Sequence, residues 1–291
     1  MSLTLNEDAS TIKRIIGLII LAALLISIIA CAMTGEGDLM NKIPREQLVI
    51  MAASSLTDVL PEIGRQFNEL HPNIDLSFNF DGSQRLRTQL ILGASADVFI
   101  SADWKQTKDL EEARLTLTKG KSFAHNKLSI ITHENFRVKP DTPIRKLKDL
   151  AAPGIKLVLA NNNVPAGRYT RQLLEDAENS ESFGTGFKDK VMHNLISNES
   201  NVRSIVQKVS LGEADAGVVY HTDVKPNVEN LKLIAIPTDI NITTSYPVVV
   251  LKDSTQYSLA QEFVAFLYSD HTQDTLLKYG FDPTNSATLI E

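Results

Sequence analysis

Apolar runs that fit β-strands alternate with stretches of helical periodicity from Gln47 to the end of the chain. The expected strands are Leu48–Ala53, Ile74–Phe80, Asp97–Ser101, Leu128–Thr132, Ile155–Ala160, Ala216–Tyr220 and Tyr246–Leu251. One helix face is predicted by Leu56, Val59, Leu60, Ile63, Phe67 and Leu70, and another by Val202, Ile205, Val206 and Val209. Strands that alternate with helices predict α/β sheets with mainly parallel strands.

The first predicted helix contains a proline at position 61. Pro61 follows Ser55 by about six residues, and inside a helix it would remove a hydrogen bond and clash with an earlier carbonyl. The sequence therefore predicts either an irregular first turn or a helix that begins near Pro61.

Two of the predicted strands end in serine where a helix is expected to begin. Ser54 and Ser55 follow the first strand, and Gly82 and Ser83 follow the second. The N–H groups in the first turn of a helix have no partner within the helix, so they are free to bind an anion. Two such strand ends in one domain predict a cradle for an oxyanion.

The first 31 residues have the pattern of an export segment. Lys13 and Arg14 precede the uncharged apolar run Ile15–Ala30, and Ala30-Cys31 resembles a bacterial lipobox. We expect a lipoprotein signal peptide over residues 1–30, lipidation of Cys31 and a tether over residues 31–46. A transmembrane anchor is the alternative, although a run of 16 residues is shorter than the roughly 20 needed to span a bilayer.

Composition limits the remaining function classes. The chain has 291 residues, 43% of them hydrophobic, and a formal net charge of −6, so it can form two lobes of about 100–150 residues each. The negative charge does not favour nucleic-acid binding. Cys31 is the only cysteine, which excludes an internal disulfide, and the six histidines show no metal-ligand spacing. We expect no cofactor, no metal site, no phosphate-binding glycine loop and no nucleophile elbow.

Several charged residues are candidates for catalysis or anion binding. Asp97 and Asp103 could form an acid–base pair, but we expect both to cap structure instead. Arg85, Arg168 and Arg203 each fall near a predicted donor loop. We interpret them as surface or supporting residues, because a buried arginine without a partner would be costly.

Short motifs distributed over the chain resemble one family. The matching stretches are Ala52–Thr57, Gly93–Asp103, Val164–Tyr169, Asn201–Arg203, Ala216–Tyr220, Tyr246–Val248 and Lys278–Phe281. In this order they are similar to the molybdate-binding proteins of bacterial ABC importers, and they cover nearly all of the chain from Leu48 to Phe281.

This resemblance implies an α/β protein with the type II periplasmic-binding fold. In that fold two α/β lobes are joined by two crossover strands, here Leu128–Thr132 and Tyr246–Leu251, with a ligand cleft between the lobes. The first lobe would comprise residues 47–126 and 251–291, and the second would comprise residues 127–250. Closure of the two lobes around the ligand would resemble a hinge.

The resemblance also implies which groups bind the oxyanion. Ser55, Ser83 and Tyr220 would donate through hydroxyls, and Ala166 and Val202 would donate through backbone N–H groups. Two neighbours independently favour such donors: Pro165 suits the first turn of a helix, and Asn201 is a good N-cap beside the Val202 amide. We also expect Tyr220 to end its strand with the hydroxyl at the rim of the cleft.

The leading hypothesis is therefore a monomeric, lipid-anchored, extracytoplasmic receptor and not an enzyme. It would bind molybdate or tungstate and deliver the anion to the permease of an ABC transporter. One alternative is a receptor for another tetrahedral oxyanion such as sulfate. A further alternative is an exported hydrolase or transferase on the same scaffold, because fold alone does not fix function.

Overall fold

A computed structural model describes residues 46–134, 143–224 and 230–284. The predicted signal peptide, Cys31 and the tether up to residue 45 lie outside the described residues. Among the helices that the model describes, none combines the length and apolar character that crossing a membrane requires.

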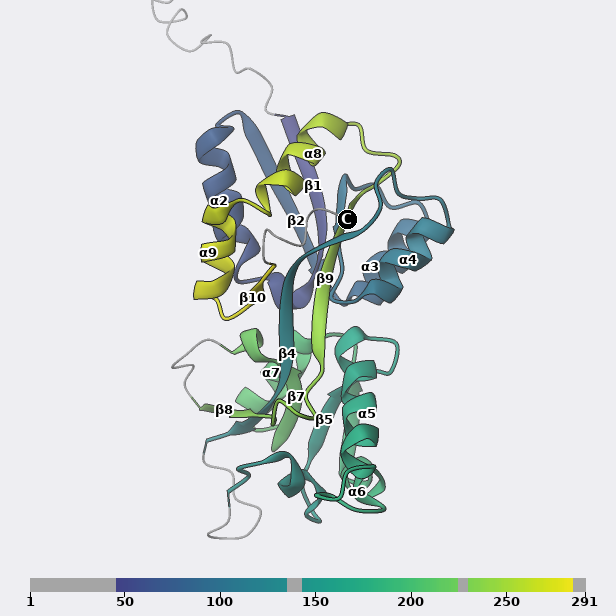
Figure 1. The fold of residues 1–291 in the computed structure, drawn as a ribbon, viewed down its shortest axis with the longest axis vertical. Coiled ribbons are helices and arrows are strands. Elements are labelled where there is room, and N and C mark those ends of the chain that lie inside the picture. The colour runs from purple at the N-terminus through teal and green to yellow at the C-terminus, as the bar shows by residue number, and fades with distance from the viewer. Residues whose placement is uncertain (1–45, 135–142, 225–229, 285–291) are drawn as a thin grey trace, which may run out of the picture. The chain divides into compact units, whose positions relative to one another are not determined.

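The first sheet is formed mainly by the N-terminal half of the chain (Figure 1). Its strands, in spatial order, are β2 (Ile74–Asp81), β1 (Glu46–Ala53), β3 (Val98–Ile100), β9 (Thr243–Val250), β4 (Lys121–His133) and the short β10 (Asp282–Pro283). The helices of this part are α2 (Leu60–Leu70), α3 (Ser83–Ile91), α4 (Trp104–Glu112), α8 (Tyr257–Phe266) and α9 (Asp270–Lys278). In Figure 1, α3 and α4 lie on one side of the sheet and α2, α8 and α9 on the other.

A second group of strands continues from β4. Its members are β8 (Leu231–Ala235) and β7 (Ala216–Tyr220), which both pair with β4, followed by β5 (Leu157–Ala160) and β6 (Leu195–Glu199). The helices here are α5 (Pro165–Glu178), α6 (Phe187–His193) and α7 (Val202–Ser210). Three 3₁₀ turns complete the described elements: η1 (Ser54–Leu56), η2 (Leu147–Ala151) and η3 (His221–Asp223).

The strand β4 belongs to both groups. Its residues up to Lys127 pair with β9, and its residues from Leu128 onward pair with β7. The strand β9 pairs only with β3 and with the first part of β4 among the described strands. Figure 1 shows β4 and β9 running side by side between the two groups of helices. These two strands therefore connect the two α/β halves of the fold.

The expectation of mainly parallel strands is wrong. Among the strand pairings of the described residues, five are antiparallel and four are parallel. The parallel pairs join neighbours that are linked through helices, as β1 is to β2, whereas every pair that includes β4 or β9 is antiparallel. Apolar runs reveal that a strand exists but carry no information about its direction.

The helix that contains Pro61 begins as the second alternative predicted. The turn η1 covers Ser54–Leu56, and α2 starts at Leu60 with Pro61 in its first turn. A proline is tolerated there because first-turn N–H groups have no partner inside the helix. The chain after β1 can therefore leave the sheet in a tight turn before the regular helix begins.

Two carboxylate–arginine pairs join the two halves of the fold. Arg168 of α5 places Nη1 2.9 Å from Oδ2 of Asp103, and Arg203 of α7 places Nη2 2.6 Å from Oδ2 of Asp58. Arg203 also donates through Nε to the Ser54 carbonyl at 3.1 Å. Both arginines therefore have the partners that the interpretation of them as supporting residues requires.

Another carboxylate, that of Asp223 in η3, is fully buried at the end of β7. Its Oδ2 accepts a hydrogen bond from the Tyr220 N–H at 2.8 Å, while its Oδ1 lies 3.9 Å from Nε of Arg203. Burial raises the pKa of Asp223 from 3.8 to about 6, and the charge of Arg203 offsets only part of this effect. Folding therefore favours the protonated form of this carboxyl.

Replacing Gly167 of α5 by alanine is expected to destabilise the fold. A Cβ there would lie 2.1 Å from the Asn161 carbonyl oxygen and 2.4 Å from that of Ala160, which are backbone atoms that cannot rotate away. We expect Gly167→Ala to lower the free energy of unfolding by at least about 2 kcal/mol in denaturant titrations. Gly64→Ala is the matched control, because its Cβ would meet only side-chain carbons of Phe78 and Leu76 at 3.0–3.1 Å. A control variant as unstable as Gly167→Ala would contradict this explanation.

The raised pKa of Asp223 predicts a dependence of stability on pH. Between about pH 4 and pH 6 the folded state retains a proton that the unfolded state has lost, so the stabilisation present at low pH disappears as pH rises. Asp223→Asn cannot ionise, so its free energy of unfolding should not show this decrease with pH. In the wild type the decrease amounts to roughly 3 kcal/mol for a shift of about two pKa units. Unfolding free energies measured from pH 4 to pH 7 would test this. The exposed control Asp176→Asn should follow the wild type, and parallel curves for Asp223→Asn would contradict the assignment.

Candidate anion-binding site

A small cavity lies between the two halves of the fold. It is lined by Ala53, Ser54, Ser55, Gly82, Ser83, Ala102, Val164, Pro165, Ala166, Val202 and Tyr220. All five residues predicted to bind the oxyanion are in this set, although they come from five separate segments of the chain. The space open to the centre of a water molecule is only about 10 Å³, so the cavity excludes a sugar, a nucleotide or a peptide.

Four helical segments begin at this cavity. The turn η1 starts at Ser54, α3 at Ser83, α5 at Pro165 and α7 at Val202. The first-turn N–H groups of an α-helix lack partners within the helix and carry partial positive charge. Their convergence creates a region that favours an anion without any formal positive charge.

The ends of α5 and α7 place the predicted backbone donors. Pro165 stands in the first turn of α5, so the Ala166 amide is the first N–H group of that helix. Asn201 caps α7 by accepting a hydrogen bond from the Ser204 N–H at 3.0 Å. Both local predictions are confirmed, and the Val202 amide is left among the N–H groups that the helix itself does not satisfy.

The three predicted hydroxyls are oriented by different partners. The Oγ atom of Ser83 accepts a hydrogen bond from the Ala102 N–H at 3.1 Å, which leaves the serine proton free to donate. The Oγ atom of Ser55 lies 2.9 Å from the Tyr246 hydroxyl. The Tyr220 hydroxyl is buried and has no hydrogen-bond partner among the described residues.

Tyr220 is more deeply placed than expected. We predicted a hydroxyl at the rim of a cleft, but the residue is only 2% exposed. Burial raises the pKa of its phenol well above the usual value. Tyr220 is therefore a neutral donor, and an unpaired buried hydroxyl of this kind is costly unless something accepts its hydrogen bond.

The acidic residues considered for catalysis have structural partners instead. Oδ1 of Asp103 accepts a hydrogen bond from the Gln106 N–H at 2.9 Å at the start of α4. Oδ2 of Asp97 accepts a hydrogen bond from the Val49 N–H at 2.8 Å. The prediction of a capping role is confirmed for Asp103, whereas Asp97 supports the strand β1 and the Ser254 hydroxyl and caps none of the described helices.

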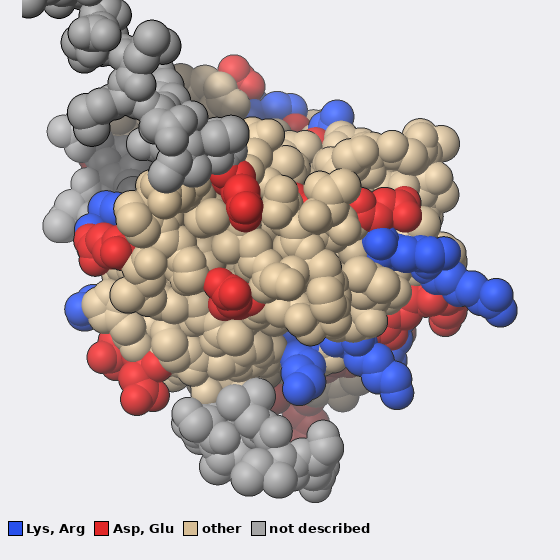
Figure 2. All heavy atoms as spheres, turned by 90° about the horizontal axis from the view of Figure 1, so that it is seen from above, with Lys and Arg blue, Asp and Glu red and all other residues tan. Residues whose placement is uncertain are grey.

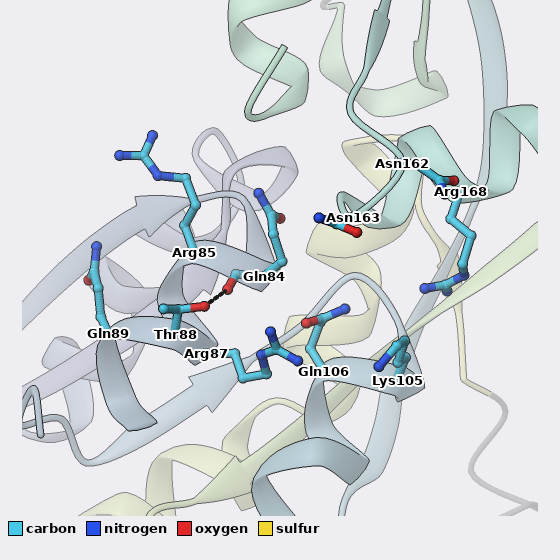
Figure 3. A pocket seen from close by; sticks show the side chains of 10 residues that line it. All are labelled: Gln84, Arg85, Arg87, Thr88, Gln89, Lys105, Gln106, Asn162, Asn163 and Arg168. Carbon is cyan, nitrogen blue, oxygen red and sulfur yellow. Dashed lines mark hydrogen bonds between the residues drawn. The ribbon is translucent and has the colours of Figure 1, made fainter. Parts of the chain in front are cut away.

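A larger hollow of about 630 Å³ lies between α3, α4 and the loop after β5. Its lining residues, shown in Figure 3, are Gln84, Arg85, Arg87, Thr88, Gln89, Lys105, Gln106, Asn162, Asn163 and Arg168. The cations among them already have carboxylate partners: Arg87 and Lys105 both contact Asp109, and Arg85 lies 3.2 Å from Asp81. Burial favours neutral Asp109, but Lys105 and Arg87 outweigh it and lower the pKa of this carboxyl. The hollow is therefore a poor match for a small unpaired dianion.

The face shown in Figure 2 likewise offers no site for an anion through formal charge. On the face shown in Figure 2, Lys and Arg side chains are intermingled with Asp and Glu side chains and form no broad basic area. The described residues contain no group of three or more His, Cys, Asp or Glu side chains that could hold a metal ion.

Sequence reasoning missed Tyr246 and Asn126, which form hydrogen bonds behind Ser55. Ser54 and Gly82, which the sequence placed at the strand ends but not among the donors, also line the cavity. The sequence signal for Gly82 is its place beside Ser83. The structure adds the reason for a glycine there, because a Cβ would lie 2.4 Å from the Ser200 carbonyl oxygen. Tyr246 belongs to one of the stretches that resemble the family, but neither that match nor an apolar strand pattern reveals a hydroxyl that points toward Ser55.

Comparison with known proteins agrees with this fold. The model of the bacterial extracellular solute-binding protein family matches residues 48–282. The periplasmic molybdate-binding protein of Azotobacter vinelandii has 19% identity and a TM-score of 0.69, with coverage of 81% of this chain and 99% of that chain. The sulfate-binding protein SubI of Mycobacterium tuberculosis has 16% identity and a TM-score of 0.72, with coverage of 83% and 88%. At these identities the two structures establish the type II periplasmic-binding fold alone.

A relative found by sequence has a higher identity to this chain than these two structures have. The molybdate-binding protein ModA of Mycobacterium tuberculosis is 34% identical over 234 residues, which cover 80% of this chain and 84% of that protein. Together with the family match over residues 48–282, this places the chain in the family of molybdate-binding proteins among the bacterial extracellular solute-binding proteins.

Proposed function

We propose that this protein captures molybdate or tungstate in the small cavity and delivers the anion to the permease of an ABC transporter. The observation that carries the proposal is the cavity itself, whose lining residues are all uncharged and include the unpaired Tyr220 hydroxyl. Ser55, Ser83 and Tyr220 would donate through hydroxyls, and Ala166 and Val202 through backbone N–H groups.

The chemistry of the donors fits a tetrahedral dianion. Such an ion needs several hydrogen-bond donors, and helix N-termini supply partial positive charge without a countercharge. Hydrogen phosphate carries an O–H group that the backbone N–H groups of this lining cannot accept and that a hydroxyl could accept only by giving up its role as a donor, which disfavours this anion. Sulfate has the charge and shape of molybdate but shorter bonds to oxygen, so donors spaced to contact molybdate on every side would leave sulfate with poor contacts on at least one side.

Closure of two lobes would enclose the ligand. We propose a first lobe of residues 47–126 and 251–291 and a second of residues 127–250, with the hinge near the change of partners in β4 between Lys127 and Leu128. The strand β9 pairs with the first sheet, so we place the second hinge near its start at Thr243. The pairs Arg168–Asp103 and Arg203–Asp58 would then form only when the cleft is closed.

The N-terminal segment suggests how the protein is retained at the membrane. We propose that residues 1–30 are removed as a lipoprotein signal peptide, that Cys31 carries the lipid and that residues 31–46 act as the tether. The receptor would then be a monomer outside the cytoplasm, anchored near its permease. A binding role without catalysis is favoured because the cavity presents neither a paired carboxylate nor an activated nucleophile among its lining residues.

A receptor for sulfate is the second candidate, because the sulfate-binding protein SubI has a similar fold. Isothermal titration calorimetry on the chain from residue 32 onward separates the candidates. We expect molybdate and tungstate to bind with Kd below about 1 μM, and sulfate and hydrogen phosphate to bind at least about 100-fold more weakly. Tight sulfate binding without molybdate or tungstate binding would reject the ligand assignment and leave the fold unaffected.

Tyr220→Phe separates a ligand contact from a structural role. The Tyr220 hydroxyl has no partner in the described part of the chain, so its removal should not lower the free energy of unfolding of the ligand-free protein. Loss of a hydrogen bond to a charged ligand should weaken molybdate binding by about 10- to 100-fold.

Tyr268→Phe is the matched control for this substitution. The Tyr268 hydroxyl is also buried without a partner among the described residues, but Tyr268 does not line the cavity. Calorimetry should show unchanged molybdate affinity for the control. Equal affinities for Tyr220→Phe and the wild type would remove Tyr220 from the site.

A further inference from the structure

Three buried polar side chains, Asn126, Tyr246 and Ser55, form a hydrogen-bonded series that ends at the cavity. The Asn126 amide nitrogen lies 3.3 Å from the Tyr246 hydroxyl oxygen, which lies 2.9 Å from Oγ of Ser55. Asn126 is 1% exposed, Tyr246 is fully buried and Ser55 is 2% exposed. Water therefore does not compete for these hydrogen bonds, and each proton must have a definite place.

The direction of the hydrogen bonds in this series is fixed at Asn126. Its side-chain Oδ1 accepts a hydrogen bond from the Lys127 backbone N–H at 2.9 Å. A backbone N–H can only donate, so the opposite end of the Asn126 amide must be its NH₂ group. That group donates to Oγ1 of Thr222 at 2.8 Å and to the Tyr246 hydroxyl oxygen.

This orientation determines what Tyr246 and Ser55 can do. Since Tyr246 accepts from Asn126, its own proton is available for Ser55, the second polar atom that it contacts. Burial raises the pKa of the Tyr246 phenol, so the hydroxyl keeps this proton at neutral pH. Ser55 then accepts from Tyr246, and its own proton is left for the cavity that Ser55 lines.

We propose that Asn126 and Tyr246 are positioning residues that make Ser55 a hydrogen-bond donor toward the bound oxyanion. This inference rests on the proposed function, because it concerns the same site. The relay of Asn126, Tyr246 and Ser55 prevents the opposite arrangement, in which Ser55 is the donor to Tyr246. If Ser55 donated to Tyr246, it would present only lone pairs to the cavity and would repel a dianion.

The substitution Asn126→Asp reverses the relay. The new carboxylate still accepts from the Lys127 N–H with one oxygen, but its other oxygen accepts where the amide donated. Tyr246 would then donate to this carboxylate rather than to Ser55, and the Ser55 proton would turn toward Tyr246. We expect molybdate affinity, measured by calorimetry at about pH 8, to fall by about 100-fold or more.

Tyr246→Phe provides the contrast and the rescue. Without the tyrosine hydroxyl, the Ser55 proton has no competing acceptor, so Tyr246→Phe alone should weaken molybdate binding by less than about 10-fold. In the double variant Asn126→Asp, Tyr246→Phe, the reversal has no route to Ser55. Its affinity should recover to within about 10-fold of the single Tyr246→Phe variant.

Two patterns would overturn the relay. One is an Asn126→Asp protein with affinity close to that of the wild type. The other is a weak Asn126→Asp protein that Tyr246→Phe does not rescue, which would indicate charge repulsion or damage to the fold. Wild-type binding separates the two hypotheses: a wild type that binds no oxyanion contradicts the proposed function, whereas a binding wild type without the rescue contradicts only the relay.

Neutron diffraction on deuterated wild-type crystals tests the relay even if Asn126→Asp does not fold. The expected result is a deuteron on the Tyr246 oxygen directed at Oγ of Ser55, with the Ser55 deuteron directed into the cavity. A deuteron on Ser55 directed at the Tyr246 oxygen would refute the proposal.

Discussion

Orientation of uncharged dipoles is the constraint on which the site depends. A cavity without formal positive charge stabilises an anion only if every hydrogen-bonding group facing it presents a proton. Backbone N–H groups meet this condition automatically, because they can only donate, and four helical segments bring their first turns to the cavity. Hydroxyls do not meet it automatically, since each can donate or accept. Their orientation must be imposed by neighbours such as the Ala102 N–H behind Ser83.

The fold supplies these neighbours from the strands that join its halves. Asn126 lies on β4 close to the point where that strand changes partners, and Tyr246 lies on β9 beside it. Ser55 belongs to η1 in the first half of the fold. The two crossover strands therefore have a second role besides connecting the lobes, because they carry the groups that fix the direction of the Ser55 hydrogen bond. A change in the twist of these strands would alter the donor as well as the width of the cavity.

The sequence predicted the local structure around the candidate site better than the pairing of the sheet. Serines at strand ends, Pro165 in a first turn and Asn201 at an N-cap are local signals, and the structure places them as expected. Strand direction and the polar neighbours of Ser55 depend on segments distant in the chain, and the Ser55–Tyr246 contact spans 191 positions. Apolar periodicity carries no information at that range. The family resemblance supplied the five donors, whereas the groups that orient them became visible only in three dimensions.

The arginines near the cavity show why neutral donors can dominate there. Arg168 and Arg203 are close enough to attract attention, yet each binds a carboxylate of the first half of the fold, Asp103 or Asp58. A guanidinium group that is held in this way contributes little net field to the cavity, because its partner cancels most of its charge at a distance. The same pairs bring the two halves together. Under the proposed function, Arg168 and Arg203 would therefore hold the two halves together, and the bound anion would be stabilised by dipoles whose direction the fold determines.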